Sequence, residues 1–145
     1  PQCPRSDRWS SDTQQKRLTE LLDAITNRYR VNEDSIFLTG LSMGGYGTWT
    51  MATNSPARFA AVAPICGGRD PAKAANLVDV PIWVFHGDQD KPVPFEKSVK
   101  MVDAIKEAGG TQVRFTTMEN VGHNCWSAAY ATPELYQWMR AQVKE

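Results

Sequence analysis

Apolar positions along this chain recur with two periods that alternate from one end to the other. Between residues 11 and 29 they follow one another at offsets of three and four, which predicts an amphipathic helix that Ser10 or Ser11 can cap. Shorter apolar runs lie between the helical stretches, and the first two of these runs are typical of buried strands. The expected strands are 35–40, 59–65, 80–85 and 112–118. The other expected helical segments are 42–54, 71–76, 95–108 and 133–143.

Strands that alternate with helices predict an α/β fold, in which right-handed crossovers build a parallel sheet covered on both faces. A length of 145 residues suits one domain, so we expect residues 1–145 to form a single folded unit. In such sheets the reactive groups gather beyond the carboxyl ends of the strands. The polar or reactive residues that follow the predicted strands are Ser42, Cys66, Asp88, Asp90 and His123.

Charge and composition exclude several classes of protein. Sixteen basic and sixteen acidic residues cancel, and no run of like charge stands out, so binding to nucleic acid or to an anionic membrane surface is not expected. No apolar stretch approaches the roughly 18 residues that cross a bilayer. The odd count of three cysteines leaves at least one thiol unpaired within the chain.

The stretch from Gly40 to Gly44 reads Gly-Leu-Ser-Met-Gly and lies between a predicted strand and a predicted helix. This is the position of the nucleophile elbow, a tight turn that exposes a serine hydroxyl at the start of a helix. We expect Gly40 and Gly44 to provide clearance, Ser42 to be the nucleophile, and the backbone amide of Met43 to point toward a developing oxyanion. The alternative is a glycine-rich turn that only packs closely or holds a phosphate.

A serine hydroxyl needs a base to take its proton, and the chain has two histidines. His123 follows the last predicted strand in a loop of small and polar residues, so we expect it to be the base. The alternative for a loop histidine is a solvated surface residue. His86 ends a strand before Gly87, an enclosed position where a structural, hydrogen-bonded histidine is expected.

The base needs a carboxylate to orient it, and the turn after the third strand offers two. Asp90 lies further out and is expected to reach His123, whereas Asp88 is expected to cap amides of its own turn. Asp70 is an outside candidate whose alternative is a surface turn. The chain order of serine, aspartate and histidine is the order of α/β-hydrolases. No metal is expected, because the two histidines are far apart and no Cys-x-x-Cys pair exists.

Together these residues resemble a known family. The chain is similar to α/β-hydrolase esterases of the phospholipase/carboxylesterase, dienelactone hydrolase and feruloyl esterase type, which include bacterial predicted peptidases. The matching stretches are 36–49, 64–68, 81–90 with Val93 and Pro94, and 122–126.

The resemblance implies a three-layer αβα fold with a mostly parallel sheet. It also implies a triad of Ser42, Asp90 and His123 that hydrolyses carboxylic esters through an acyl-enzyme, without a cofactor. The implied substrates are small-molecule or plant cell-wall esters, including feruloyl-type esters, and the implied location is secreted or periplasmic in bacteria. Two alternatives to an esterase stay open, a serine peptidase and a catalytically idle hydrolase-like binding module.

The chain departs from the family at its start. Sheets in this family have more strands than the four predicted here, and residues 1–4 look like the end of a preceding strand. The missing part includes the loop that supplies the second oxyanion amide. We therefore expect an N-terminally incomplete domain that holds the C-terminal half of the sheet, completed by the rest of a longer polypeptide or by a second chain.

Aromatic residues and cysteines near the predicted site are weaker candidates. Trp9, Tyr46 and Trp126 follow points where the chain reaches the active face, so they could form the wall of a substrate pocket; core packing is the alternative. Trp49, seven residues after the serine, is expected in the core. Cys66 and Cys125 could form a disulfide behind the base or remain free buried thiols.

Overall fold

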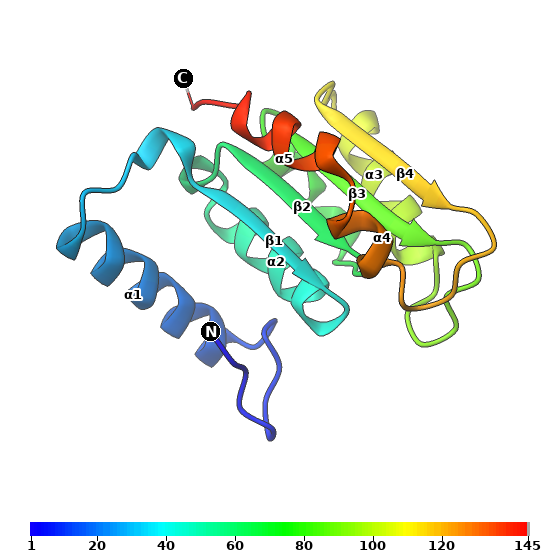
Figure 1. Ribbon diagram of the computed structural model, residues 1–145, viewed down its shortest axis with the longest axis horizontal. Helices are drawn as coiled ribbons and strands as arrows, with labels where there is room; N and C mark the ends of the chain where they lie inside the picture. Colours follow the sequence, from blue (N-terminus) through cyan, green and yellow to red (C-terminus); the bar gives the residue numbers. More distant parts are fainter. Residues whose placement is uncertain (145) are drawn as a thin grey trace.

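The structure is a computed structural model that describes residues 1–144. Its centre is a parallel sheet of four strands, whose spatial order is the order of the sequence. The strands are β1 (Phe37–Leu41), β2 (Ala61–Ile65), β3 (Ile82–Gly87) and β4 (Val113–Met118). Because all four run the same way, their carboxyl ends meet at one edge of the sheet (Figure 1).

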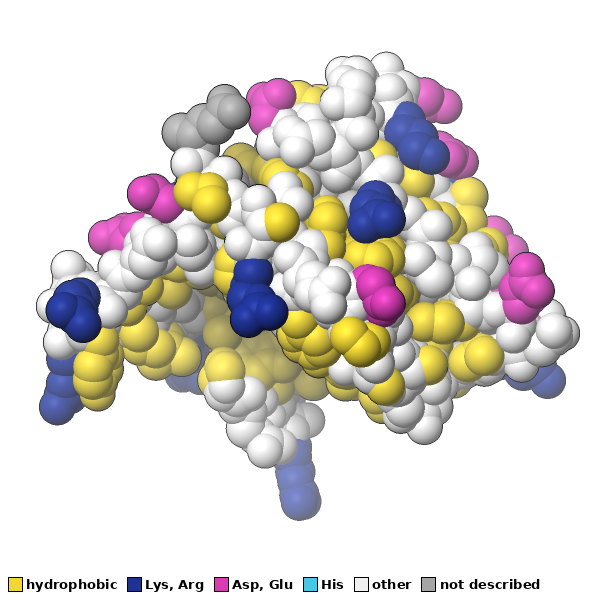
Figure 2. All heavy atoms as spheres, turned by 45° about the horizontal axis from the view of Figure 1, so that its top comes forward, with side chains coloured by type: hydrophobic (Ala, Val, Ile, Leu, Met, Phe, Trp, Pro, Cys, Tyr) yellow, Lys and Arg dark blue, Asp and Glu magenta, His cyan; other side chains and the backbone are white. Residues whose placement is uncertain are grey.

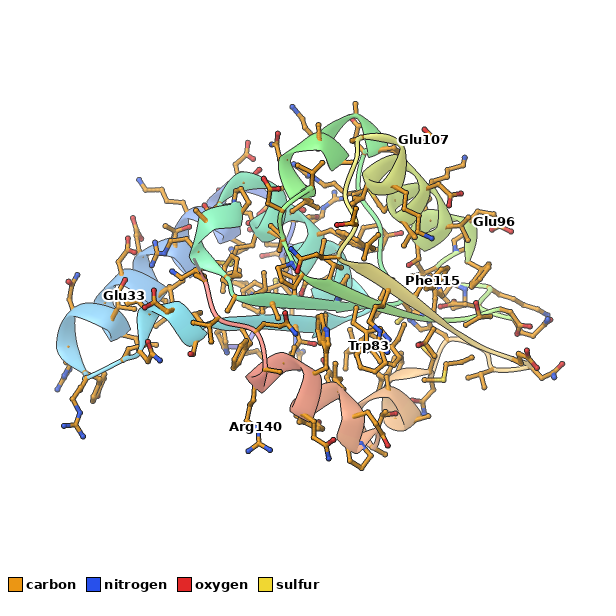
Figure 3. All side chains as sticks on the ribbon, turned by 90° about the horizontal axis from the view of Figure 1, so that it is seen from above. Glu33, Trp83, Glu96, Glu107, Phe115 and Arg140 are labelled. Carbon is orange, nitrogen blue, oxygen red and sulfur yellow. The ribbon has the colours of Figure 1, made fainter. Side chains whose placement is uncertain are left out.

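Helices cover both faces of the sheet, as expected for the α/β class. One face carries α2 (Met43–Asn54), the 3₁₀ helix η3 (Pro71–Leu77) and α3 (Glu96–Glu107). The other face carries α4 (Trp126–Tyr130) and α5 (Pro133–Arg140). Figure 3 shows this three-layer arrangement from the edge, with the labelled Trp83 on the side of α5.

Two apolar cores lie on the two faces of the sheet. On the face of α2 and α3, Trp49 is fully buried against strand residues such as Val62 and Val84. This placement confirms the prediction that Trp49 belongs to the core. On the opposite face, Trp83 stacks on Phe85 at 5.1 Å between ring centroids and packs under α5. Every residue of β2 and β3 is buried, so the central strands are the rigid support for the loops that follow them.

The helix α1 (Asp12–Arg28) stands at the side of the molecule (Figure 1). Ser11 is its N-cap and accepts a hydrogen bond from the Gln14 amide at 3.3 Å. Leu18 and Leu22 reach the core, but Leu21 and Ile25 are 41% and 40% exposed. Short 3₁₀ turns, η1 (Glu33–Ser35) and η2 (Pro56–Arg58), precede β1 and β2.

Two predictions about the start of the fold are wrong. Within residues 1–144, β1 is the edge strand of the sheet and its residues are half-buried or exposed, and not buried on both faces as predicted. Residues 1–4 pair with no strand that the structure describes, so the predicted strand end is not seen there. Sequence reasoning also missed α4, which is only five residues long and too short to show a helical period. Within residues 1–144, no helix has the length and apolar character needed to span a membrane.

Candidate active site

Ser42 occupies a strained turn between β1 and α2. Its backbone has φ 51° and ψ −117°, a conformation that residues with a side chain rarely adopt. Gly40 makes the turn possible, because a Cβ at this position would lie 2.5 Å from the Gly44 carbonyl oxygen. The turn therefore stores strain under the hydroxyl that it presents at the start of a helix.

The second glycine that the elbow requires is Gly45, and the prediction for Gly44 is wrong. A Cβ on Gly44 would meet only the Trp9 ring, at 4.0 Å, which is an ordinary contact. A Cβ on Gly45 would clash with the Ile65 carbonyl oxygen, because α2 crosses closely over the end of β2. The Gly44-Gly45 pair in the sequence contained this signal, but the motif assigns the role to the first glycine of the two.

The amide of Met43 lies at the turn that presents Ser42. Met43 is the first residue of α2, so its N–H lies among the helix amides that lack an intrahelical acceptor. The Ser42 amide is already occupied, since it donates to the Ile65 carbonyl at 3.0 Å and to Cys66 Sγ at 3.3 Å. The positive end of the α2 dipole adds to the attraction for negative charge at this point.

The structure brings the predicted serine, histidine and aspartate together. Ser42 Oγ lies 2.8 Å from His123 Nε2, and His123 Nδ1 lies 2.8 Å from Asp90 Oδ2. Because Nδ1 faces a carboxylate, it carries the ring hydrogen, and Nε2 accepts the serine proton. The His123 side chain is 24% exposed, and the Trp126 ring packs edge-on against it at 5.1 Å. Asp90 and Trp126 thus orient the imidazole ring, and part of the ring is still accessible to solvent.

The turn after β3 selects Asp90 over its neighbours. The Asp90 amide donates to the Gly87 carbonyl at 3.2 Å, and Asp90 Oδ1 accepts the Val93 amide at 2.9 Å. These bonds aim Oδ2 at the histidine loop. Asp88 does not cap its own turn as expected, because its buried Oδ1 has no hydrogen-bond partner. Asp70 lies elsewhere and caps η3 by accepting the Ala72 amide at 3.1 Å.

His86 lies behind Asp90 and is fully buried. Its Nε2 is 3.1 Å from Asp90 Oδ2 and 2.9 Å from the Val93 carbonyl, and its Nδ1 is 2.7 Å from Ser98 Oγ. Burial lowers the pKa of His86, and the hydrogen bond to Val93 and the charge of Asp90 oppose this shift. The sequence indicated an enclosed, hydrogen-bonded histidine here, but not that it touches the same carboxylate as His123.

Cys66 and Cys125 are fully buried free thiols, so the structure corresponds to the second of the two alternatives given for them. The hydrogen bond with Cys125, followed by burial, raises the pKa of Cys66. The Cys66 sulfur is therefore a protonated neighbour of the elbow and not a competing nucleophile. Cys66 Sγ, a carboxylate oxygen of Asp90 and a ring nitrogen of His123 lie within 4.8 Å of one another, a spacing that could hold a metal ion. Hydrogen bonds already engage the carboxylate and the ring.

The three aromatic candidates have different surroundings, and that of Trp126 is the His123 ring. Trp9 lies over Gly47 and shares a groove of about 580 Å³ with Ser42. Tyr46 borders a separate hollow with Arg69 and Lys97. The groove around Ser42 follows the free edge of β1, and most of the exposed surface of its lining is apolar. Figure 2 shows a recess with hydrophobic side chains between the left part of the molecule and the rest, while charged side chains of both signs are scattered over the face.

Known proteins are similar to this chain in sequence and in fold. The family model described as dienelactone hydrolase family matches residues 5–134, which confirms the resemblance. One similar solved structure is the crystal structure of a thermostable esterase, whose sequence is 36% identical to this chain and whose TM-score is 0.95. The match covers 99% of this chain and 43% of the esterase chain. A second similar structure is that of Zea mays acyl-protein thioesterase 2, with 18% sequence identity and a TM-score of 0.70. The match covers 90% of this chain and 63% of the thioesterase chain. Because the sequence identity is low, this similarity supports the fold alone.

Two curated relatives match over shorter stretches. "Probable feruloyl esterase C" of Aspergillus niger is 24% identical over 106 residues, which are 73% of this chain and 39% of the relative. A protein of Nocardia uniformis subsp. tsuyamanensis is 31% identical over 78 residues, which are 52% of this chain and 23% of the relative. The chain thus spans less than half the length of the curated relatives it matches.

Proposed function

Because the chain belongs to the dienelactone hydrolase family, we propose that it carries the catalytic groups of a serine hydrolase that cleaves carboxylic esters. The single observation that carries this proposal is the continuous line of contacts from Ser42 Oγ through the His123 ring to Asp90 Oδ2, with 2.8 Å at each step. These distances are those of a nucleophile, a general base and an orienting carboxylate.

The proposed reaction proceeds in two halves. His123 Nε2 takes the Ser42 proton as Oγ attacks the ester carbonyl, and the amide of Met43 donates to the oxyanion that forms. The tetrahedral intermediate collapses when the same nitrogen returns the proton to the leaving alkoxide, which departs as an alcohol. Water then enters, gives a proton to His123, attacks the acyl-serine, and releases the acid with Oγ reprotonated. Asp90 holds the ring in one tautomer throughout.

We propose esters with an apolar or aromatic acyl group as substrates. The part of the groove next to Ser42 is bordered by Trp9 and Met43, which offer apolar contact and no charge, whereas the rest follows the edge of β1, where we expect further strands. A relative is named as a feruloyl esterase, and feruloyl groups are aromatic. Replacement of Trp9 by alanine is expected to raise KM for an aryl ester such as methyl ferulate more than for p-nitrophenyl acetate. Equal effects on both substrates would remove Trp9 from acyl recognition.

The test of the reaction is Ser42→Ala. The protein that carries this change should lose p-nitrophenyl ester turnover and covalent labelling by a fluorophosphonate probe, because both need the activated hydroxyl. Ser127→Ala is the matched control, since this serine bonds only to the exposed Asn124 side chain, at 2.8 Å. An unlabelled wild-type protein of normal fold would favour the idle binding module, and cleavage of peptides in place of esters would favour the peptidase.

A further inference from the structure

Asp90 receives hydrogen bonds from two histidines on a single oxygen. Oδ2 is 2.8 Å from His123 Nδ1 and 3.1 Å from His86 Nε2, while Oδ1 accepts the Val93 amide. The proposed reaction uses only the first of these rings. The hydrogen bond between His86 and Asp90 therefore has no role in the proposed mechanism.

The hydrogen-bond partners of His86 determine where its ring hydrogen lies. Nε2 faces two groups that can only accept, the Asp90 carboxylate and the Val93 carbonyl, so Nε2 must carry the hydrogen. Nδ1 faces the Ser98 hydroxyl at 2.7 Å, which can donate to it. Full burial favours the neutral ring, and a neutral ring has one hydrogen. His86 is thus a donor toward Asp90 and an acceptor toward Ser98.

Packing on several sides restricts this ring. Phe95 lies edge-on to it at 5.6 Å between centroids, and Ser98, on α3, is fully buried. The Ser98 hydroxyl is also placed to donate to the Gly67 carbonyl at 3.1 Å, at the turn that follows β2, so its single hydrogen is shared between that oxygen and His86 Nδ1. The ring is therefore held between the ends of β2 and β3 and the first turn of α3, all of which are rigid parts of the fold.

We propose that His86 is a positioning residue for the hydrolytic reaction, whose Nε2–H fixes Asp90 Oδ2 against His123 and takes up part of that oxygen's charge. The inference rests on the proposed function. If the donor is lost, Oδ2 is left to His123 alone and stabilises the protonated form of that ring more strongly. A protonated His123 cannot accept the serine proton, so activity at acidic pH should fall first.

The test is a pair of variants, His86→Gln and His86→Met. Glutamine places an N–H donor at the ε position of the side chain, as histidine does, and methionine has the same length without a donor. We expect the acidic half-point of the kcat/KM profile to move up by about half a pH unit or more in His86→Met and to stay near wild type in His86→Gln. Cys66, Cys125 and Tyr46, the other titratable groups near Asp90, are the same in both variants.

A second readout does not depend on activity. The chain has only two histidines, so the ring signals of His123 can be assigned by NMR from variants that lack His86. The Nδ1 proton of His123 should shift in His86→Met and return toward its wild-type position in His86→Gln. A purely structural role would perturb the two variants alike, and that result, or wild-type profiles in both, would overturn the proposal.

If His86→Met does not fold, Ser98→Ala and Ser98→Thr repeat the comparison. Alanine removes the hydroxyl that fixes the His86 tautomer, and threonine keeps it, so the half-point should move only in Ser98→Ala. Movement in both or in neither would contradict the inference. Failure of the proposed function is seen separately, because the wild-type protein would then not react with a fluorophosphonate while the NMR comparison could still be made.

Discussion

The turn after β1 and the turn after β3 reach the same edge of the sheet, but they are stabilised in opposite ways. Ser42 has a backbone conformation that is unfavourable in itself, and close helix packing over Gly40 and Gly45 maintains it. The turn that contains Asp90 has no positive φ, and hydrogen bonds to buried groups satisfy its carboxylate. The position of the Ser42 hydroxyl thus depends on a strained backbone. The position of the Asp90 carboxylate, which orients the base, depends on hydrogen bonds that occupy its oxygens.

This difference teaches where each kind of substitution should act. Changes to the network alter orientation and protonation, so activity and pH dependence should respond before stability does. Changes to the glycines of the elbow alter packing, so stability should respond first.

Replacement of His123 by alanine should lower kcat/KM for an ester by about 10⁵-fold, because no other group within reach takes the serine proton. Unfolding in urea should change little, since the ring is partly exposed. Asn124→Ala is the control in the same loop. A loss of less than tenfold in His123→Ala, measured with p-nitrophenyl acetate, would end the assignment of the base.

Asp90→Asn should lower kcat/KM by about 10⁴-fold, since an amide can present its NH₂ to Nδ1 and favour the wrong tautomer of His123. The matched control is Asp88→Asn, two residues away, whose buried Oδ1 has no hydrogen-bond partner, whereas Asp90 Oδ2 bonds to both histidines. Activities that fall equally in both variants would mean that the whole turn, and not the carboxylate of Asp90, is required.

Gly45→Ala should reduce the free energy of unfolding by about 2 kcal/mol, because the added methyl group meets the Ile65 carbonyl oxygen. Gly44→Ala should be neutral or stabilising by up to about 1 kcal/mol, since alanine is the better helix residue and space is available. Urea unfolding of the pair measures the difference. The reverse order of stabilities would show that the elbow is supported in another way.

The smallest effect expected is a pH dependence of stability. The folded pKa of His86 is lowered by burial, so its contribution is present above about pH 6.5, where a histidine of an unfolded chain titrates, and is lost as the pH falls toward the folded pKa. In this range the free energy of unfolding should fall with a slope of at most about 1.4 kcal/mol per pH unit. Urea unfolding at several pH values should show a shallower slope in His86→Gln. Identical slopes in the two proteins would contradict the predicted burial effect.

Much of this arrangement could be predicted from sequence because strand periodicity and motif position agree. The buried runs located the ends of β1 and β3, and those ends placed Ser42 and Asp90 at one edge of a parallel sheet. The length of β1 was nearly right, but its burial was not, since periodicity cannot say whether a strand has a neighbour on each side. The further strands that the family resemblance implies stay a prediction.

The features of the site that the sequence did not predict depend on contacts between distant segments. The need for Gly45 arises where α2 crosses the end of β2, and the link from His86 to Ser98 arises where α3 turns one face toward β3. Neither follows from local spacing, because helix rotation and crossing distance are set by packing. Trp126 shows the same limit, since only the fold reveals that its ring lies against His123.

The absence of a side chain at Gly87 also has a consequence for motion. The Val121 and Gly122 carbonyls fill the space where a Cβ would stand, and the Gln89 amide donates to Val121 O at 3.0 Å. The acid-bearing and base-bearing loops are thereby joined backbone to backbone. Thermal motion at this edge of the sheet should therefore move Asp90 and His123 together. The distance that varies most is then the one between Ser42 Oγ and His123 Nε2, across which the proton is transferred.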